Sequence, residues 1–238
     1  MNLVIVPILF VSFLVFGLTG FGSALIAMPL LIPLLGVDAA TALVAIVSLV
    51  AQVLMLVRYR DSISVSTVWR LVLASLVAIP VGLTAVHYLD GRVVLLLLGC
   101  VLVGYGVYGL LRPRLPEIKN PRWAFAFGFA GGFLSGAYNT GGPPVVIYAN
   151  LLRWSPSQFK SNLGGAFLLN SVVVVTAHVA SGHFTSTVMQ DSVLALPATL
   201  VGVFVGWWLE KLINPYTFSK LILILLIIIG LRLITSNI

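Results

Sequence analysis

Charged residues are scarce in this chain, and their scarcity excludes a water-soluble domain. Only 8% of the 238 residues are Asp, Glu, Lys or Arg, whereas 60% are hydrophobic. A soluble domain carries about 25% charged residues, which it needs to cover its surface. Hydrophobic stretches of about 20 residues recur along the whole chain, with the few charges between them. The sequence therefore predicts a polytopic, all-α integral membrane protein.

Cysteine is almost absent as well. Cys100 is the only one, which excludes an internal disulfide and a cysteine metal cluster. We expect it to be a small buried hydrophobic residue, and we expect no cofactor and no metal site. The net charge of +7 does not indicate a nucleic-acid partner, because loop Lys and Arg residues set membrane orientation. The first hydrophobic stretch lacks the basic start and cleavage site of a signal peptide, so we expect it to be part of the fold.

Glycine and proline, in contrast, are concentrated in two hydrophobic segments. The first segment, residues 3–35, contains Gly17-Leu18-Thr19-Gly20-Phe21-Gly22-Ser23. The second, residues 123–152, contains the run from Gly131 to Pro144. Inside a bilayer, irregular backbone is tolerated only where protein or a water-filled cavity satisfies its polar groups. Matched breaks in two halves of a chain therefore point to a transport site.

Full helical spans follow each broken segment. We predict them at residues 38–59, 67–88, 90–111, 157–180, 187–212 and 214–233, with Asp38 and Ser157 as N-caps. Residues 112–122 form a polar, proline-rich linker. The sequence therefore predicts three parts: a first membrane repeat at 1–111, a cytoplasmic linker at 112–122 and a second membrane repeat at 123–238. Gly82, Asp90 and Gly106 correspond to Gly206, Asn214 and Gly230 at one constant offset.

The distribution of charge favours re-entrant hairpins for the broken segments. The arms are about 20 Å long at 1.5 Å per residue, which is short of the roughly 30 Å hydrocarbon core. If each hairpin returns to the face it entered, most basic residues lie on the cytoplasmic side, as the positive-inside rule requires. Only Arg92 and Arg232 then lie outside, with His183 and Asp191. The cytoplasmic set is Arg58, Arg60, Arg70, Arg112, Arg114, Lys119, Arg122, Arg153, Lys160, Lys211 and Lys220.

One hairpin plus three spans is an odd number of crossings, so the second repeat is inverted relative to the first. Both termini are then predicted outside. The fold class is thus two inverted repeats, each a glycine-broken re-entrant helical hairpin plus three transmembrane helices. Hairpins from opposite faces would bring their tips together near the midplane.

The two tips form the predicted substrate site. Each offers the free N–H groups and partial positive charge of a helix start, which suit an anion. The alternative is that small residues only let helices pack closely. The predicted site residues at the tips are Thr19, Gly20, Phe21, Gly22, Ser23, Tyr138, Asn139, Thr140, Gly141 and Gly142.

Polar residues in the spans are further candidates. Ser48 and Gln52 are four residues apart, and Asn162 and Asn170 are eight apart, so each pair shares a helical face. We expect Gln52, Asn162 and Asn170 to bind substrate beside the tips, although polar residues of this kind also bridge helices.

Titratable groups suitable for coupling are few. His178 is the one candidate for proton coupling, with an ordinary interfacial histidine as the alternative, and no carboxylate is expected mid-span. Lys160 could attract anions or only set orientation. A hydrolase with Ser135 as nucleophile and His178 as base is disfavoured, because the two lie too far apart along the predicted fold.

The motifs of the second half carry a resemblance to a known family. Gly-Phe-Leu-Ser-Gly-Ala-Tyr, Gly-Gly-Pro-Pro and Ser-Pro-Ser-Gln-Phe-Lys, between Gly131 and Asn170, resemble the sulfite exporter TauE/SafE family. The first-half run from Gly17 to Gly22, followed by Pro29, resembles its opening motif. The sequence departs from the family at Gly-Phe-Gly-Ser, where a run of glycines is common, and at Lys160, where arginine is usual.

The resemblance implies a non-enzymatic carrier of the bacterial inner membrane for sulfite, sulfonates or related oxyanions. We expect a secondary transporter that works by alternating access, one half moving against the other, with substrate held between the glycine-rich tips. Its expected partners are the lipid bilayer, a small anionic substrate and a coupling ion, H⁺ or Na⁺. A passive anion channel using the same site is the alternative, and a membrane scaffold without transport is a further one.

Overall fold

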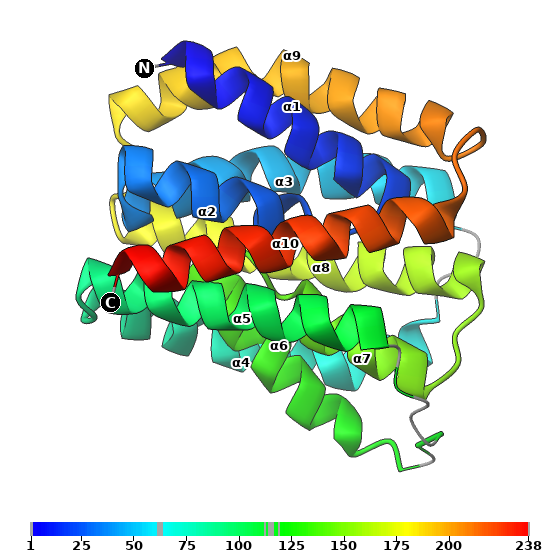
Figure 1. Cartoon of the computed structure of the whole chain (residues 1–238). Coiled ribbons are helices and arrows are strands. Elements are labelled where there is room, and N and C mark those ends of the chain that lie inside the picture. Colours follow the sequence, from blue (N-terminus) through cyan, green and yellow to red (C-terminus); the bar gives the residue numbers. More distant parts are fainter. Residues whose placement is uncertain (1, 61–63, 112, 114–116, 119, 238) are drawn as a thin grey trace.

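The protein is helical throughout the part of the chain that the structure describes. The computed structural model (Figure 1) describes residues 2–60, 64–111, 113, 117–118 and 120–237. Ten helices and no strand lie within these ranges. They are α1 (Asn2–Thr19), α2 (Ser23–Leu35), α3 (Val37–Tyr59), α4 (Val65–His87), α5 (Gly91–Leu111), α6 (Trp123–Tyr138), α7 (Gly142–Leu151), α8 (Pro156–Ala180), α9 (Ser186–Leu209) and α10 (Pro215–Asn237).

Six of these helices are long and apolar enough to cross a membrane. They are α3, α4, α5, α8, α9 and α10, the six spans that the sequence predicts. Large hydrophobic side chains such as Phe204, Trp208 and Ile228 are exposed on the outer surface, as expected where a protein faces lipid. The chain is a multi-pass membrane protein. Cys100 is exposed on α5, so the expectation that it is buried was wrong; its apolar span offers it a lipid-facing position instead.

Two helix starts differ from the predicted caps. Ser155 caps α8, and its backbone N–H and side chain form a reciprocal pair with Gln158, the arrangement of a capping box. Gly36 stands before α3, which places Asp38 in the first turn. Ser157 and Asp38 are therefore inside their helices, where Asp38 still interacts favourably with the helix dipole.

Two short breaks interrupt the helical pairs α1–α2 and α6–α7. The first is Gly20–Gly22 and the second Asn139–Gly141. Gly20 and Gly22 have φ of 85° and 91°, and Asn139 has φ of 54°, a left-handed conformation that glycine and asparagine adopt most easily. Both breaks are shorter than the glycine-rich runs in the sequence suggest, because Gly17 belongs to α1 and Gly131, Gly132 and Gly136 belong to α6.

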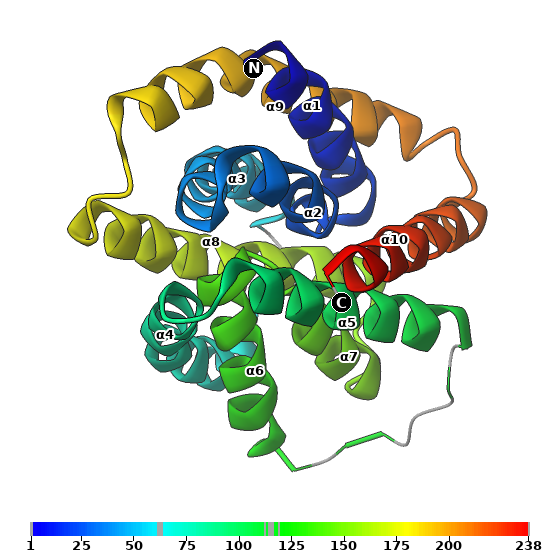
Figure 2. The same ribbon diagram turned by 60° about the vertical axis from the view of Figure 1, so that its left-hand side comes forward.

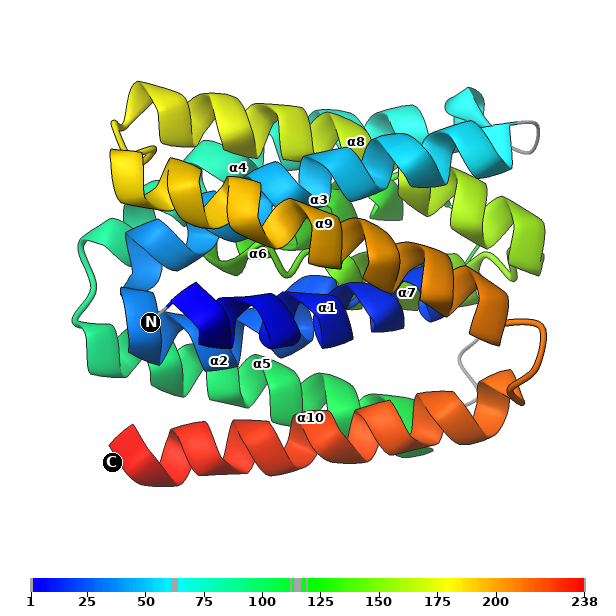
Figure 3. The same ribbon diagram turned by 90° about the horizontal axis from the view of Figure 1, so that it is seen from above.

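The helices run between two ends of the molecule. At the terminal face, α1 begins and α10 ends, and the α2–α3, α4–α5 and α8–α9 turns lie there too (Figures 1 and 3). At the linker face, α6 begins, and the α7–α8 and α9–α10 turns lie there. The α1–α2 pair starts and ends at the terminal face, and the α6–α7 pair starts and ends at the linker face.

The described basic residues are distributed unequally between these ends. Arg92 and Arg232 lie near the terminal face, whereas the others lie near the linker face. That second group is Arg58, Arg60, Arg70, Arg122, Arg153, Lys160, Lys211 and Lys220. Arg112, Arg114 and Lys119 of the predicted linker lie outside the described residues.

The helices pack mainly in four pairs that each join the first half of the chain to the second. These pairs are α1 with α9, α4 with α6, α3 with α8 and α5 with α10 (Figure 2). α2 packs on α1 and α3, and α7 packs on α6. Helices α1, α2, α3 and α9 therefore form one group, and α4, α6, α7 and α8 form another, with α3 and α8 in contact between them.

Glycines set how closely two of these pairs approach. On α6, a Cβ at Gly128, Gly132 or Gly136 would overlap backbone atoms of Leu71, Ser75 or Ile79 on α4. On the α1–α9 contact, Gly17 and Gly206 lie against each other's helix in the same way. Small residues let membrane helices approach until their backbones touch, which is the main source of packing energy in lipid.

This packing predicts the effect of adding one methyl group. Gly132→Ala should lower the stability of the detergent-solubilised protein by about 1–3 kcal/mol, because the Cβ would overlap the backbone of Ser75. Gly104→Ala is the matched control, since no atom lies within 4 Å of its Cβ position on α5. Thermal unfolding measures both, and equal melting temperatures for the two variants would contradict the role assigned to the α4–α6 contact.

Candidate functional site

The two breaks meet at one cavity inside the molecule. Its lining comes from both breaks and from α3 and α8, and it encloses about 50 Å³. One water needs about 10–15 Å³ on this measure, so the space suits a few waters or one small oxyanion. The lining residues are Phe16, Phe21, Gly22, Ser23, Ala24, Leu25, Ser48, Gln52, Ser135, Asn139, Thr140, Gly141, Gly142, Phe167, Asn170, Ser171 and Val174. We call this space the tip cavity.

Most of the predicted site residues line the tip cavity. From the first break these are Phe21, Gly22 and Ser23. From the second they are Asn139, Thr140, Gly141 and Gly142. Gln52 and Asn170 join them from α3 and α8, as does Ser48. Of the residue pairs that the helical spacing suggests, Ser48 and Gln52 are together here, whereas Asn162 is not in the lining.

Four predicted residues have other positions. Thr19 Oγ1 lies 2.6 Å from the carbonyl oxygen of Phe21 and 2.8 Å from that of Val15, so its hydroxyl serves the turn itself. Tyr138 donates its hydroxyl proton to the carbonyl of Val94 on α5. The other two are Asn162, whose Oδ1 accepts a hydrogen bond from the Ser64 N–H, and Gly20, which lies beside Lys160.

Hydrogen bonds hold the second break to α3 of one helix group and to α6 of the other. Asn139 donates from Nδ2 to the carbonyl of Thr41 on α3 at 2.7 Å, and its own N–H donates to Ser135 on α6. The Thr140 N–H donates to the carbonyl of Leu134. A Cβ at Gly141 would overlap Ser135 Oγ and the Gly131 carbonyl. Only glycine fits where the chain passes this close to α6.

Two helices begin at the tip cavity without a capping side chain. Gly22 precedes α2 and Gly141 precedes α7, and neither helix has a side-chain hydrogen bond at its start. The first N–H groups of a helix have no partner within it, and they carry its partial positive charge. Pro143 and Pro144 have no N–H, so the start of α2 supplies more backbone donors than the start of α7.

Three polar side chains of the lining have a buried atom without a partner. Within the described residues, Gln52 Oε1, Thr140 Oγ1 and Asn170 Nδ2 accept or donate no hydrogen bond. The Asn170 amide is held on its other side by Ser75 Oγ at 2.6 Å. Buried polar atoms usually have a partner, and these orphan atoms on one cavity lining make the tip cavity the candidate site. The lining contains no Asp, Glu, Lys or Arg.

A larger cavity adjoins the tip cavity toward the linker face. It encloses about 440 Å³ and shares Phe21, Gly22 and Leu25 with the tip cavity. The Phe21 ring makes edge contacts with Tyr105 and Phe159, at centroid distances of 6.2 and 6.1 Å. We call this space the linker-side cavity. Phe21 lines both spaces.

Lys160 lines the linker-side cavity but is not a free cation. Its Nζ forms an ion pair with Glu210, and Tyr59 lies within hydrogen-bond distance of both side chains. The pair joins α8 to the end of α9. Only 13% of the Lys160 side chain is exposed, which makes its pairing with Glu210 necessary for burial.

One buried carboxylate was missed by the sequence analysis. Asp191 was expected at the outer face of the membrane, near the start of the predicted span 187–212; it lies in the second turn of α9 and is buried, with 3% of the residue exposed. Its Oδ1 has no partner among the described residues. It lines a cavity of about 170 Å³ near the terminal face, with Ala39, Thr185 and Thr187.

His178 is buried near the terminal face. Its Nδ1 lies 2.9 Å from Nδ1 of His183, in the α8–α9 turn. Ser135 lines the tip cavity, whereas His178 does not, and no hydrogen bond joins the two among the described residues.

Nearly the whole chain matches a known family of membrane proteins. The family model described as sulfite exporter TauE/SafE matches residues 5–233, nearly the whole chain. The chain belongs to the TauE/SafE family. This is a family of membrane exporters. Of the motifs that indicated it, the stretch around Asn139–Gly142 lines the tip cavity, whereas Phe159 and Lys160 of the Ser-Pro-Ser-Gln-Phe-Lys motif line the linker-side cavity.

One relative of this TauE/SafE protein is a curated bacterial sequence. The protein from Cupriavidus necator named as a probable sulfite/organosulfonate exporter TauE is 26% identical over 173 residues, which cover 69% of this chain and 68% of the relative. No solved structure gives a significant match.

The second tip of this TauE/SafE protein yields a prediction about Asn139. Asn139→Gly and Asn139→Ala both remove the hydrogen bond to Thr41, but alanine must also adopt the left-handed φ of 54°. The alanine variant should therefore be less stable than the glycine variant by about 1 kcal/mol. Chemical unfolding in detergent measures this, and an alanine variant as stable as the glycine variant would contradict the conformation assigned to the tip.

Proposed function

We propose that this protein is a secondary transporter that carries a small sulfur oxyanion, of the sulfite or organosulfonate class, by alternating access. The substrate would be held in the tip cavity, between the starts of α2 and α7. The observation that carries the proposal is a set of buried polar atoms without a partner among the described residues, on side chains that line one small cavity at two uncapped helix starts. Thr140 Oγ1 and Asn170 Nδ2 can donate to an anion, whereas Gln52 Oε1 would accept from a protonated oxygen of the substrate or from a bound water.

The chemistry of this cavity favours an anion. Moving an ion out of water into an apolar medium costs tens of kcal/mol by idealised Born estimates. Two helix starts, together with hydroxyl and amide donors, would offset that cost without a buried Lys or Arg. A fixed cation at mid-depth would itself cost about 3 kcal/mol on insertion scales. A cavity of about 50 Å³ favours sulfite over a bulky sulfonate.

The helix pairing supports an inverted repeat of residues 1–111 and 123–238, joined by residues 112–122. Exchanging α1–α5 for α6–α10 turns the α1–α9 pair into the α6–α4 pair and leaves α3–α8 and α5–α10 unchanged. Gly82 packs on α6 as Gly206 packs on α1. The α1–α2 and α6–α7 pairs, which start from opposite faces (Figures 1 and 3), would be re-entrant hairpins.

The charge distribution supports an orientation in the bacterial inner membrane. Most described basic residues lie near the linker face, so the positive-inside rule assigns that face to the cytoplasm. Both termini would then be outside. The linker-side cavity would be the cytoplasmic route to the substrate site.

Phe21 would act as the gate between that route and the site. Phe21 lines both cavities, and its ring contacts Tyr105 and Phe159. The tip cavity shares lining residues with the linker-side cavity and none with the cavity near the terminal face, which supports access from the linker face. A rotation of the Phe21 side chain would open the site to the cytoplasm.

The moving parts would not be the two halves of the chain. α1 packs on α9 of the other half, and α6 packs on α4, so neither half can move without breaking tight glycine contacts. The group α1, α2, α3 and α9 would move instead against the group α4, α6, α7 and α8. The tip cavity lies between these groups, with Gln52 on one and Thr140 and Asn170 on the other.

The proposal predicts the effect of removing one hydroxyl. Thr140→Val keeps the shape of the side chain but removes a donor to the anion. A hydrogen bond to a charged group contributes about 1.5–3 kcal/mol, so the Kd for sulfite should rise about tenfold or more. The variant should be as stable as the wild type, because the Thr140 hydroxyl has no partner among the described residues. Isothermal titration with sulfite and thermal unfolding measure both quantities.

The control is Thr176→Val, which removes an exposed hydroxyl from α8 without touching the tip cavity. Sulfite binding that Thr140→Val leaves unchanged would contradict the site. Counter-flow of radioactive sulfite in proteoliposomes then separates a carrier from a channel. A carrier shows saturation and counter-flow, whereas linear flux without counter-flow would support the passive channel.

Coupling to H⁺ would involve the buried groups near the terminal face, Asp191 and His178. An ionisable group buried in a membrane protein is costly and commonly functional. Asp191→Asn should abolish sulfite accumulation driven by a pH gradient while leaving counter-flow intact, and His178→Gln tests the histidine in the same assay. Gradient-driven accumulation that persists in both variants would exclude these groups as the coupling site.

A further inference from the structure

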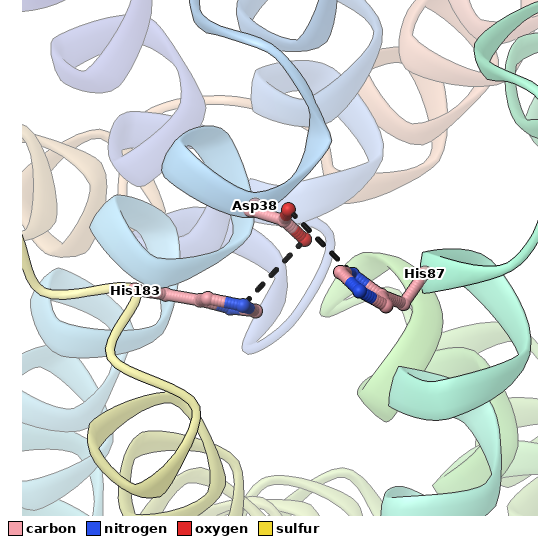
Figure 4. Close-up of side chains that lie close together, drawn as sticks. All are labelled: Asp38, His87 and His183. Carbon is pink, nitrogen blue, oxygen red and sulfur yellow. Dashed lines mark ion pairs between the residues drawn. The ribbon is translucent and has the colours of Figure 1, made fainter.

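All three histidines of the chain gather at the terminal face. His87 ends α4, His178 lies in the last turn of α8, and His183 lies in the α8–α9 turn. Asp38, in the first turn of α3, lies among them. Figure 4 shows Asp38, His87 and His183 converging from three segments of the chain. None of these residues lines the tip cavity or the linker-side cavity.

The geometry points to a divalent transition-metal site, of the kind that binds Zn²⁺, formed by Asp38, His87 and His183. His87 Nδ1 and His183 Nε2 each lie 3.9 Å from an oxygen of the Asp38 carboxylate. The three ligand atoms lie within 4.8 Å of one another. Ligands of a tetrahedral zinc ion lie about 3.3 Å apart, so each histidine must approach the Asp38 carboxylate by about 0.6 Å, and the two histidine nitrogens must approach each other by at most about 1.5 Å. The side chains of His87 and Asp38 are 59% and 50% exposed, so they are free to move closer together around an ion.

His178 provides the second, independent observation. A histidine that binds a metal normally has its other ring nitrogen held by a neighbouring acceptor, which fixes its orientation. His183 directs Nε2 toward Asp38, and its Nδ1 lies 2.9 Å from Nδ1 of the fully buried His178. His183 can therefore donate its Nδ1 proton to His178 and keep the Nε2 lone pair for the ion. Water would complete the coordination on the exposed side.

Sequence analysis predicted no metal site, because the ligands are separated by 49 and 96 residues and match no local ligand spacing. Two histidines and one carboxylate suit Zn²⁺, Ni²⁺ or Co²⁺, whereas Mg²⁺ and Ca²⁺ require a set of oxygen ligands. The site would distinguish these two classes of ion.

The test is titration of chelator-treated, detergent-purified protein with ZnCl₂, followed by isothermal calorimetry and thermal unfolding. We expect one Zn²⁺ per chain and a raised melting temperature, with no effect of MgCl₂. His87→Gln and Asp38→Asn should each weaken Zn²⁺ binding about tenfold or more. Asp90→Asn is the control, because it removes the same charge from the same face without touching the cluster.

The proposal is overturned if wild-type protein binds no Zn²⁺, or if the His87→Gln and Asp38→Asn variants bind it as tightly as Asp90→Asn does. Since both changes are at exposed side chains, we expect the variants to fold, and their unfolding without metal checks this. Binding is measured without transport, so Thr140→Val should bind Zn²⁺ normally even if the transport proposal fails.

A consequence for transport rests on the proposed function. Asp38 and His87 belong to the two helix groups that would move against each other. Bound Zn²⁺ would tie the groups together at the terminal face and slow sulfite counter-flow in wild-type protein but not in His87→Gln. Equal inhibition of the two proteins would overturn this bridging role.

Discussion

The need to satisfy every backbone polar group inside a bilayer determines most of this structure. Water is absent from the hydrocarbon core, so helices must run unbroken wherever lipid surrounds them. The protein departs from that rule at Gly20–Gly22 and Asn139–Gly141, and both departures are enclosed by other helices. The same enclosure that makes the breaks tolerable brings two helix starts to one small cavity. Enclosing the two breaks among other helices thus satisfies the constraint on the backbone and also creates the proposed anion site.

Close helix packing holds the two tips in place. Gly128, Gly132 and Gly136 lie against the α4 backbone, while Asn139 fastens the second tip to α3 through the Thr41 carbonyl. At the first tip, the Thr19 hydroxyl donates a hydrogen bond to the carbonyl of Phe21. Because α1 and α6 each pack on a helix of the other half, the halves of the chain are interlocked. The cavity therefore lies between two helix groups that each combine helices from both halves of the chain.

Much of the fold followed from hydrophobicity and charge alone. Runs of about 20 apolar residues predict the six spans, and these are confirmed within a few residues at each end. The extent of the glycine-rich breaks was overestimated, since glycine has two uses in membranes: it permits turns, and it permits close helix contact. Gly17 and Gly132 serve the second use. Sequence alone does not separate these uses, because the partner backbone comes from a distant segment.

The same reason limits what sequence could say about the site. Local motifs placed Thr140 and Gly141 at the second tip, and helical spacing associated Ser48 with Gln52. Asn162 and Thr19 have the right residue types, but their hydrogen bonds are used elsewhere. Asp191 and the cluster of Asp38, His87 and His183 depend on long-range contacts, and no local pattern records them.

The most direct test of the central claim is to locate a bound anion. Selenite has the charge and shape of sulfite, and selenium scatters X-rays anomalously. A crystal of the protein grown with selenite should give a single strong anomalous peak in the tip cavity, within hydrogen-bond distance of Thr140 and the start of α2. A peak at any other place, with the tip cavity free of selenium at saturating selenite, would contradict the account.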